Sequence, residues 1–382
     1  MKSKILWLAS WYPNKLEPLN GDFIERHAKA ASLLNDITVI YVKKDHEQLT
    51  SGKTTIVEKE YKDHPSLKSI TCYYKSFAGS LSLIKYLRLQ QKLIAAYIRQ
   101  NGKPDVINVH ISFAAGLGAL FAKWKYGIPY IVTEHSTIFC PEASPSFRDQ
   151  SYAARLFIRI IIKQALRITA VSHYLAQSLA GRFQIPEPVR IPNVVDTSLF
   201  YPSHVKHEVF TFIHISVLNY QKSPDEIIDA VDLLKQKTGV LFRLIIYGPY
   251  IPHIDNKIKK QHLEDVIQYR QEVMQDELSA EVRKCHSLIL YSRFETFGCV
   301  VIEAFASGLP VIVSDIPVMH ELVTQQNGIF ARIDNAEDLA DKMLLMMEGY
   351  DRFDLKRVAE EAKEKYAFAV VARQFDELYA AR

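Results

Sequence analysis

Residues 292–310 read Ser292-Arg-Phe-Glu-Thr-Phe-Gly-Cys-Val-Val-Ile-Glu-Ala-Phe-Ala-Ser-Gly-Leu-Pro310 and lie between two short β-rich runs, 288–291 and 311–314. This order predicts a strand, a helix over residues 297–308 and a second strand. The N–H groups of a first helical turn have no partners within the helix, and the glycine at 298 lets a ligand approach the backbone. The start of this helix therefore suits an anion such as a diphosphate.

Two acidic residues flank this predicted anion site. Glu295 precedes the helix, and Glu303 lies inside it. Carboxylates repel phosphate but accept hydrogen bonds from sugar hydroxyls. Because glutamate is a common residue, the same spacing also arises by chance in an ordinary surface loop and helix. The spacing alone leaves both interpretations open.

The same alternation of strand and helix runs along the chain. Several apolar runs are continuous, as expected for strands buried on both faces of a parallel sheet. The helical stretches between or after them include Leu83–Arg99, Glu226–Gln236 and Phe368–Ala381, whereas the charged segment Lys44–Ser66 is expected to be a surface loop. The other predicted strands are Ile5–Ala9, Ile37–Val42, Val106–Val109, Tyr130–Thr133, Ile168–Val171, Phe210–Val217 and Phe242–Tyr247. This pattern predicts an α/β protein with open, doubly wound parallel sheets.

The length of 382 residues corresponds to about two domains. A polar, turn-rich stretch at 193–208 is the predicted link between them. We expect one α/β domain over residues 1–202 and a second over 203–365, with a last helix in 366–382 that could pack back on the first domain. Ligands bind at the carboxyl ends of the strands in such sheets, so two facing sheets would leave a central cleft for them.

Composition excludes several classes of protein. Hydrophobic residues make up 48% and charged residues 24%, an ordinary globular balance. The four cysteines form no C-x-x-C pair, so the sequence indicates neither a disulfide framework nor a zinc module. No apolar run approaches the about 20 residues of a membrane span, and the apolar start of the chain reads as a first strand rather than a signal peptide. These features favour a cytoplasmic protein.

Charge is divided unevenly along the chain. Residues 1–200 carry a net charge of +11 and residues 201–382 a net charge of −7, so the first half is expected to meet an anionic partner. Basic residues recur every four positions at Arg155, Arg159, Lys163 and Arg167, which places them on one helix face. This row is either a solvated helix face or a surface held near anionic lipid on the inner face of the plasma membrane.

In these motifs the chain resembles glycosyltransferase family 4, whose members are retaining enzymes of the GT-B fold. Residues 291–311 are similar to the family's E-x7-E signature. Further similar segments are Ser10–Pro13 and Gly21–Phe23 after the first strand, Ile191–Asp196 with Phe200 and Pro202 between the domains, and Glu321–Val323 with Asn327 and Gly328 near the end of the second domain. The resemblance implies two Rossmann-like domains that face a central cleft.

The resemblance also implies a donor site. Glu295 would contact the donor sugar and Glu303 the ribose, while the backbone of Phe297, Gly298 and Cys299 would hold the diphosphate. Gly21 would contribute from the first domain. Lys222 would bind the diphosphate, although Val217 stands where the family often has an arginine. His135 would lie near the donor sugar, so that His135, Glu295 and Lys222 are the expected catalytic residues; for His110 a structural role stays as open as a functional one.

The implied activity is retaining transfer of a hexose-type sugar from a UDP- or GDP-linked donor to a glycan or lipid-linked acceptor in cell-envelope or capsular polysaccharide synthesis. Family enzymes are thought to react on one face of the sugar, with the leaving phosphate helping to deprotonate the acceptor. The sequence has no D-x-D motif and no histidines at ligand spacing, so neither a metal nor another cofactor is expected. Nucleic acid is not an expected partner.

Three other functions fit the sequence less well. A nicotinamide dehydrogenase needs a G-x-G-x-x-G loop after its first strand, but the nearest string, Gly116-Leu-Gly118, lies in a predicted helix. A catalytically weak or inactive GT-B protein that binds a nucleotide sugar or glycan as a partner module is favoured by Val217 alone. An epimerase or phosphorylase of the same fold is disfavoured by the E-x7-E segment.

Overall fold

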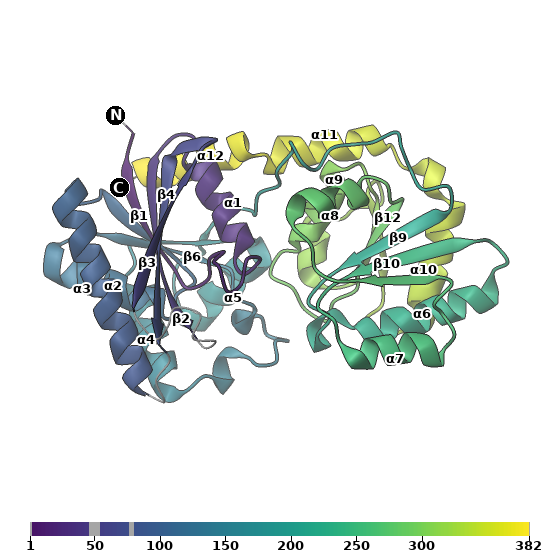
Figure 1. The fold of residues 1–382 in the computed structure, drawn as a ribbon, viewed down its shortest axis with the longest axis horizontal. Coiled ribbons are helices and arrows are strands. Elements are labelled where there is room, and N and C mark those ends of the chain that lie inside the picture. The colour runs from purple at the N-terminus through teal and green to yellow at the C-terminus, as the bar shows by residue number, and fades with distance from the viewer. Residues whose placement is uncertain (1, 46–53, 76–79, 382) are drawn as a thin grey trace. The chain divides into compact units, whose positions relative to one another are not determined.

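The computed structural model describes residues 2–45, 54–75 and 80–381, which divide into two compact units (Figure 1). The first unit comprises Met1–Val194 with Phe368–Arg382, and the second comprises Val195–Ala367. The division falls after Val194, eight positions before the one that the sequence suggested. The side chain of Val194 is buried in the core of the first unit, whereas Val195 bridges to Ala367 in the second.

The first unit is built on one sheet of strand order β3-β4-β2-β1-β5-β6-β7-β8. Its pairs are parallel except for β3 with β4. The continuous apolar runs explain this arrangement, because β1 and β5 are buried on both faces. The strands are β1 Lys4–Ala9, β2 Asp36–Asp45, β3 Thr55–Tyr61, β4 His64–Lys75, β5 Val106–His110, β6 Tyr130–Glu134, β7 Arg167–Ala170 and β8 Val189–Arg190; the helices are α1 Asp22–Ala31, α2 Ser80–Asn101, α3 Ala115–Tyr126, α4 Tyr152–Gln164, α5 His173–Phe183 and α12 Phe368–Ala380.

The last helix of the chain, α12, belongs to the first unit and packs beside α1 (Figure 1). Its Phe375 and Tyr379 are fully buried, and the indole N–H of Trp7 in β1 donates to the Tyr379 hydroxyl at 3.1 Å. Because the buried indole N–H finds its acceptor on α12, this hydrogen bond holds the helix against the sheet.

The prediction that Lys44–Ser66 forms a surface loop is wrong for the described residues. β2 continues to Asp45, and β3 pairs antiparallel with β4 at the edge of the sheet. Most β3 side chains are exposed, and the strand carries Glu58, Lys59 and Glu60. Charged residues on an edge strand discourage pairing with another chain, and they also hide the apolar alternation that usually reveals a strand.

The second unit has a fully parallel sheet of order β11-β10-β9-β12-β13-β14. Its core fills the space between this sheet and its helices, and α10 packs beside α6. The strands are β9 Phe210–Ile215, β10 Phe242–Tyr247, β11 Ile267–Arg270, β12 Ser287–Leu290, β13 Val311–Ser314 and β14 Gly328–Ala331; the helices are α6 Pro224–Lys237, α7 Pro252–Lys260, α8 Gln275–Val282, α9 Cys299–Ala306, α10 Ala336–Glu348 and α11 Leu355–Tyr366.

Each sheet contains a point where the strand order reverses. In the first unit this point lies between β1 and β5, and in the second it lies between β9 and β12. Loops that leave such neighbouring strands diverge to opposite faces of the sheet, and ligands of open α/β sheets bind in the crevice that results. The loops after β9 and β12 carry Lys222 and Glu295.

Candidate functional site

The loops after β9 and β12 are joined by hydrogen bonds in the second unit. The Gln221 amide donates to the carbonyl of Phe294 at 2.8 Å, and the backbone N–H of Arg293 donates to the carbonyl of Gln221 at 2.8 Å. The Arg293 guanidinium also donates to the carbonyl of Tyr220 at 2.6 Å. These bonds hold the two loops in one arrangement. Sequence reasoning missed Gln221 and Arg293, because their partners are distant along the chain.

Lys222 and Glu295 form an ion pair at this junction. Their side chains are 17% and 7% exposed, and the Ser292 hydroxyl also donates to Glu295 at 3.0 Å. Burial lowers the pKa of the neighbouring His214 to about 4, and the charge of Lys222 acts in the same direction. The structure thus brings together a cation and a carboxylate that the sequence predicted separately as donor ligands.

The helix α9 begins next to this pair. Gly298 is its N-cap with φ of 94°, a left-handed conformation that favours glycine, and a Cβ at this position would lie 3.0 Å from the Cε atom of Met319. The Phe297 side chain is buried against the ring of Tyr366, so only the Phe297 backbone could reach a ligand. Cys299 opens the helix and is half-buried, and Glu303 is buried within it.

Cations at the switch point of the second sheet are few. Val217, at the position where the resemblance expects an arginine, is half exposed and uncharged. The guanidinium of Arg293 is paired with Glu226 and, at 2.7 Å, with Asp334. A diphosphate bound here would therefore depend on Lys222 and on the positive end of the α9 dipole.

In the first unit, Gly21 lies at the end of the loop that joins β1 to α1. It is the N-cap of α1 with φ of 74°, and a Cβ there would lie 2.7 Å from the carbonyl carbon of Trp11. Glycine is therefore needed for this loop to pack on the start of α1. The ring of Phe23, in the first turn of α1, lies 5.0 Å from that of His135. The structure thus brings Gly21 and His135 to neighbouring elements of the first unit.

His135 belongs to a cluster of three buried histidines. His110 Nδ1 lies 3.2 Å from His135 Nε2, and His27 Nε2 donates to the carbonyl of Pro192 at 2.9 Å. Burial lowers the pKa of His27 to about 4 and holds the pKa values of His110 and His135 well below 6.5, so all three rings are neutral at pH 7. The sequence showed no clustered histidines, but the fold brings potential ligand atoms of these three within 4.8 Å of one another.

Glu134 precedes His135 and is fully buried. One carboxylate oxygen accepts the N–H groups of His135 and Ser136, and the other accepts the N–H of Ser112, each at 3.0 Å. Burial raises the pKa of Glu134, although these three donors act in the opposite direction. Glu134 therefore ties the loop after β6 to the loop after β5, a role that the sequence did not predict.

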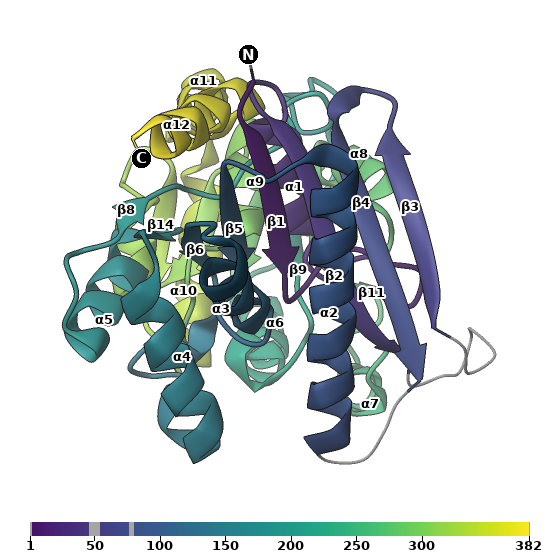
Figure 2. The same cartoon turned by 90° about the vertical axis from the view of Figure 1, so that its left-hand side faces the viewer.

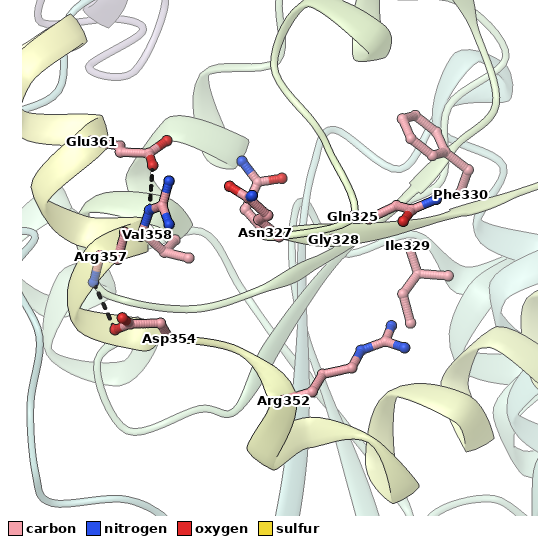
Figure 3. Close-up of a pocket in the computed structure, with 11 residues that line it drawn as sticks. Gln325, Asn327, Gly328, Ile329, Phe330, Arg352, Asp354, Arg357, Val358 and Glu361 are labelled. Atoms are coloured by element: carbon pink, nitrogen blue, oxygen red, sulfur yellow. Dashed lines mark hydrogen bonds and ion pairs between the residues drawn. The ribbon is translucent and has the colours of Figure 1, made fainter.

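The second unit contains a larger and a smaller cavity that bear on the site. The larger, of about 760 Å³, is lined by the edge strand β14 and by α11. Figure 3 shows its Arg357 turned toward Glu361 within α11. The smaller, of about 290 Å³, is lined by the loops after β9, β10 and β12, including Tyr220 and Arg293. Among the described residues, neither cavity is lined by a predicted site residue, but the smaller one lies at the switch point and is therefore the better candidate for a ligand.

Comparisons with family models and with known proteins show what the chain is similar to. Residues 199–365 match the family model of glycosyl transferases group 1, and residues 54–199 match that of Glycosyltransferase Family 4. An uncharacterized glycosyltransferase of Methanocaldococcus jannaschii is 26% identical over 76% of this chain and 77% of its own. A GDP-mannose:cellobiosyl-diphosphopolyprenol alpha-mannosyltransferase of Xanthomonas campestris is 27% identical over 72% of this chain and 74% of its own.

Solved structures share the fold along nearly the whole chain. Sucrose-phosphate synthase from Thermosynechococcus elongatus superposes with a TM-score of 0.78 at 17% identity, over 99% of this chain and 98% of that one. Anabaena HepE in complex with UDP and glucose superposes with a TM-score of 0.75 at 16% identity, over 99% of this chain and all of that one. At these identities the likeness shows the fold alone.

Proposed function

Because the chain belongs to glycosyltransferase family 4 and has the GT-B fold, we propose that it is a retaining enzyme that moves a hexose-type sugar from a UDP- or GDP-linked donor to a glycan or lipid-linked acceptor. The name of the Xanthomonas relative supports a sugar nucleotide as donor and a polyprenol-linked glycan as acceptor. A relative in Bacillus subtilis, a putative teichuronic acid biosynthesis glycosyltransferase, supports a role in the cell envelope.

The ion pair between Lys222 and Glu295 carries this proposal. A paired cation and carboxylate at the switch point of the second sheet support it, because the cation could stabilise a leaving diphosphate and the carboxylate could accept from sugar hydroxyls. A bound donor would replace this internal pairing: phosphate oxygens would take the ammonium group, and sugar hydroxyls would donate to the carboxylate. Glu303, which lies within α9, would accept hydrogen bonds from the ribose hydroxyls.

The reaction needs charge stabilisation more than it needs a nucleophile. As the bond between sugar and phosphate breaks, negative charge grows on the diphosphate, and Lys222 with the start of α9 would stabilise it. Both oxygens of Glu134 already accept backbone N–H groups, so Glu134 is poorly placed to attack the sugar. We therefore propose transfer on one face of the sugar, with the leaving phosphate taking the acceptor proton and with no metal required. His135 would contact the transferred sugar.

Binding of a nucleoside diphosphate tests the donor site directly. UDP or GDP should raise the midpoint of thermal unfolding, because a ligand that binds only the folded state stabilises it. Glu303→Ala should weaken binding by about 1–3 kcal/mol, or roughly 5–150-fold in Kd, through loss of the ribose acceptor. Thermal shift titrations with both nucleotides, followed by calorimetry, would measure this change.

Asp338→Ala is the matched control for this variant. Asp338 is also a buried acid of the second unit, but its carboxylate accepts the backbone N–H of Arg332 at 2.8 Å and lies on α10. It should lower the unfolding temperature without changing nucleotide affinity. Equal affinities for the wild type and Glu303→Ala would reject the ribose assignment. Nucleotide binding without release of free nucleoside diphosphate from any sugar nucleotide would favour the partner module over the enzyme.

A second proposal, contact with an anionic membrane, rests on three helices of the first unit. Figure 2 shows α2, α3 and α4 on the same side of that unit, and α3 packs against both of the others. They contain no aspartate or glutamate, and their exposed apolar side chains include Trp124 at 67% and Tyr152 at 74%. Their basic residues are Lys85, Arg88, Lys92, Arg99, Lys123, Lys125, Arg155, Arg159 and Lys163.

One member of the predicted basic row is placed differently. α4 ends at Gln164, and Arg167 opens β7, where its guanidinium donates to the carbonyl of Ala381 at 2.7 Å. Among the residues that the structure describes, no helix is long and apolar enough to cross a bilayer. The proposed contact is therefore peripheral, with apolar side chains in the interface and basic groups at the lipid headgroups.

Co-sedimentation with vesicles tests this surface. The chain should bind vesicles that contain anionic lipid, and binding should fall with salt. Each basic residue near the surface contributes about 1 kcal/mol at low salt, so changing Arg155, Arg159 and Lys163 together to Gln should weaken binding about 100-fold. The control changes Lys356, Lys363 and Lys365 of α11 to Gln, which removes the same charge. Equal effects of the two triples, or equal binding to neutral vesicles, would contradict the proposal.

A further inference from the structure

A line of buried hydrogen bonds crosses three strands of the first unit. The Thr169 hydroxyl in β7 donates to the Thr133 hydroxyl in β6 at 2.9 Å, and Thr133 donates to the Asn108 amide oxygen in β5 at 3.1 Å. All three side chains are fully buried. The oxygen of Asn108 is thereby turned toward β6, and its amide nitrogen toward the opposite side.

The amide nitrogen of Asn108 decides which nitrogen of His110 carries the proton. It donates to His110 Nε2 at 2.9 Å and to the Tyr379 hydroxyl at 3.2 Å. Because an amide nitrogen only donates, Nε2 of His110 must accept, and the proton of the neutral ring lies on Nδ1. The His110 ring is held by the indole of Trp7, which stacks on it at 3.9 Å.

The position of the proton on His110 in turn determines the position of the proton on His135. His110 Nδ1 lies 3.2 Å from His135 Nε2 and donates to it, so the proton of the neutral His135 ring lies on Nδ1. That Nδ1 atom is buried and has no hydrogen-bond partner in the described part of the chain. A buried N–H without a partner is costly, and a ligand oxygen would satisfy it.

We propose that Asn108, acting through His110, fixes His135 in the tautomer that presents Nδ1–H to an oxygen of the bound sugar. This inference rests on the proposed function for its ligand, but the order of protons follows from the hydrogen bonds between neutral rings and needs no ligand. Asn108 and His110 are positioning residues, since neither needs to touch the substrate. The opposite tautomer would present a lone pair to the sugar oxygen in place of a donor.

A metal centre is the competing interpretation of the same cluster. His27, His110 and His135 could offer three neutral nitrogens to one ion. The hydrogen bond between His110 and His135 places a proton between two of these rings, where a metal would require two lone pairs. The two interpretations therefore predict different protonation and different metal content.

Nitrogen NMR of the full chain with ¹⁵N-labelled histidine, without ligand, tests the tautomer directly. The signals of His135 are identified by their loss in His135→Gln. We expect a protonated Nδ1 and an unprotonated Nε2 in the wild type. Asn108→Ala and His110→Leu should yield a mixture of tautomers, whereas His110→Asn, whose amide can still donate to His135, should preserve the wild-type state. Asn35→Ala, which removes a buried amide outside the hydrogen-bonded line, is the control.

Kinetics supply the second measurement. Asn108→Ala and His110→Leu should lower kcat for sugar transfer about 10–100-fold, because a small misplacement of a contact that positions the substrate can cost about 100-fold. Their affinity for the bare nucleoside diphosphate, which lacks the sugar, should equal that of the wild type, and His110→Asn should recover most of the activity. Loss of nucleotide affinity in parallel with kcat would show a merely structural role and overturn the proposal.

The outcomes separate this inference from the proposed function. Protonated Nε2 of His135 in an active transferase would overturn the proton order and leave the transferase assignment intact. One bound zinc ion per chain, after purification without chelator, would also overturn it in favour of the metal centre. Protonated Nδ1 in a protein that turns over no sugar nucleotide would reject the proposed function and, with it, the sugar as the ligand of His135.

Discussion

Replacing Lys222 with alanine should lower the rate of sugar transfer by about 10²–10³-fold, as loss of one group aimed at developing charge typically does. Val217 supplies no charge at this switch point, and Arg293 is already paired with two acids. Lys222 is thus the cation best placed to stabilise the leaving diphosphate. Initial rates of nucleoside diphosphate release at saturating donor would measure the loss.

The control for this variant is Lys257→Ala. Its side chain is 18% exposed, close to the 17% of Lys222, and it pairs with Asp229 at 2.8 Å in the same unit. Both variants remove a largely buried lysine from an ion pair, so both should shift thermal unfolding, but only Lys222→Ala should lose activity. A rate within threefold of the wild type would reject the role of Lys222. Chelator should leave the wild-type rate unchanged, and strict dependence on Mg²⁺ or Mn²⁺ would contradict the metal-independent mechanism.

The parts of the fold that the sequence predicted are those with a strong local signal. β10 and β13 occupy the predicted residues because their apolar runs are continuous and bounded by polar turns. The antiparallel strand β3 was missed because its exposed charges follow no apolar alternation. α9 begins at Cys299, two residues later than predicted, because Gly298 adopts a left-handed conformation that ends the preceding loop.

The parts of the site that the sequence could not predict depend on contacts between distant residues. Lys222 and Glu295 were each predicted, but their pairing joins positions 73 residues apart. His27 comes from α1 and His110 from β5, and no spacing along the chain indicates that they meet His135. Such contacts follow from strand order, which a single sequence specifies only weakly.

Replacing Glu295 with alanine should reduce turnover of a sugar nucleotide by about 100-fold, since one buried charged acceptor for the sugar hydroxyls is lost at the reacting group. The affinity for bare UDP or GDP should stay the same or rise. In the structure Glu295 holds the ammonium group of Lys222, so its removal frees that cation for phosphate. This opposite response of turnover and affinity distinguishes Glu295 from Glu303, whose loss should weaken binding of the bare nucleotide.

Glu281→Ala is the comparison for Glu295→Ala, because Glu281 is a largely buried acid of the second unit that pairs with His207 at 2.8 Å and with Arg270 at 3.0 Å. It should destabilise the fold and leave both turnover and nucleotide affinity unchanged. Calorimetry with the bare nucleotide and initial rates with the sugar nucleotide, measured on the same preparations, give the two quantities. If Glu295→Ala weakens binding of the bare nucleotide as much as it slows turnover, Glu295 supports the diphosphate site and not only the sugar. The assignment of its carboxylate to the donor sugar would then be wrong.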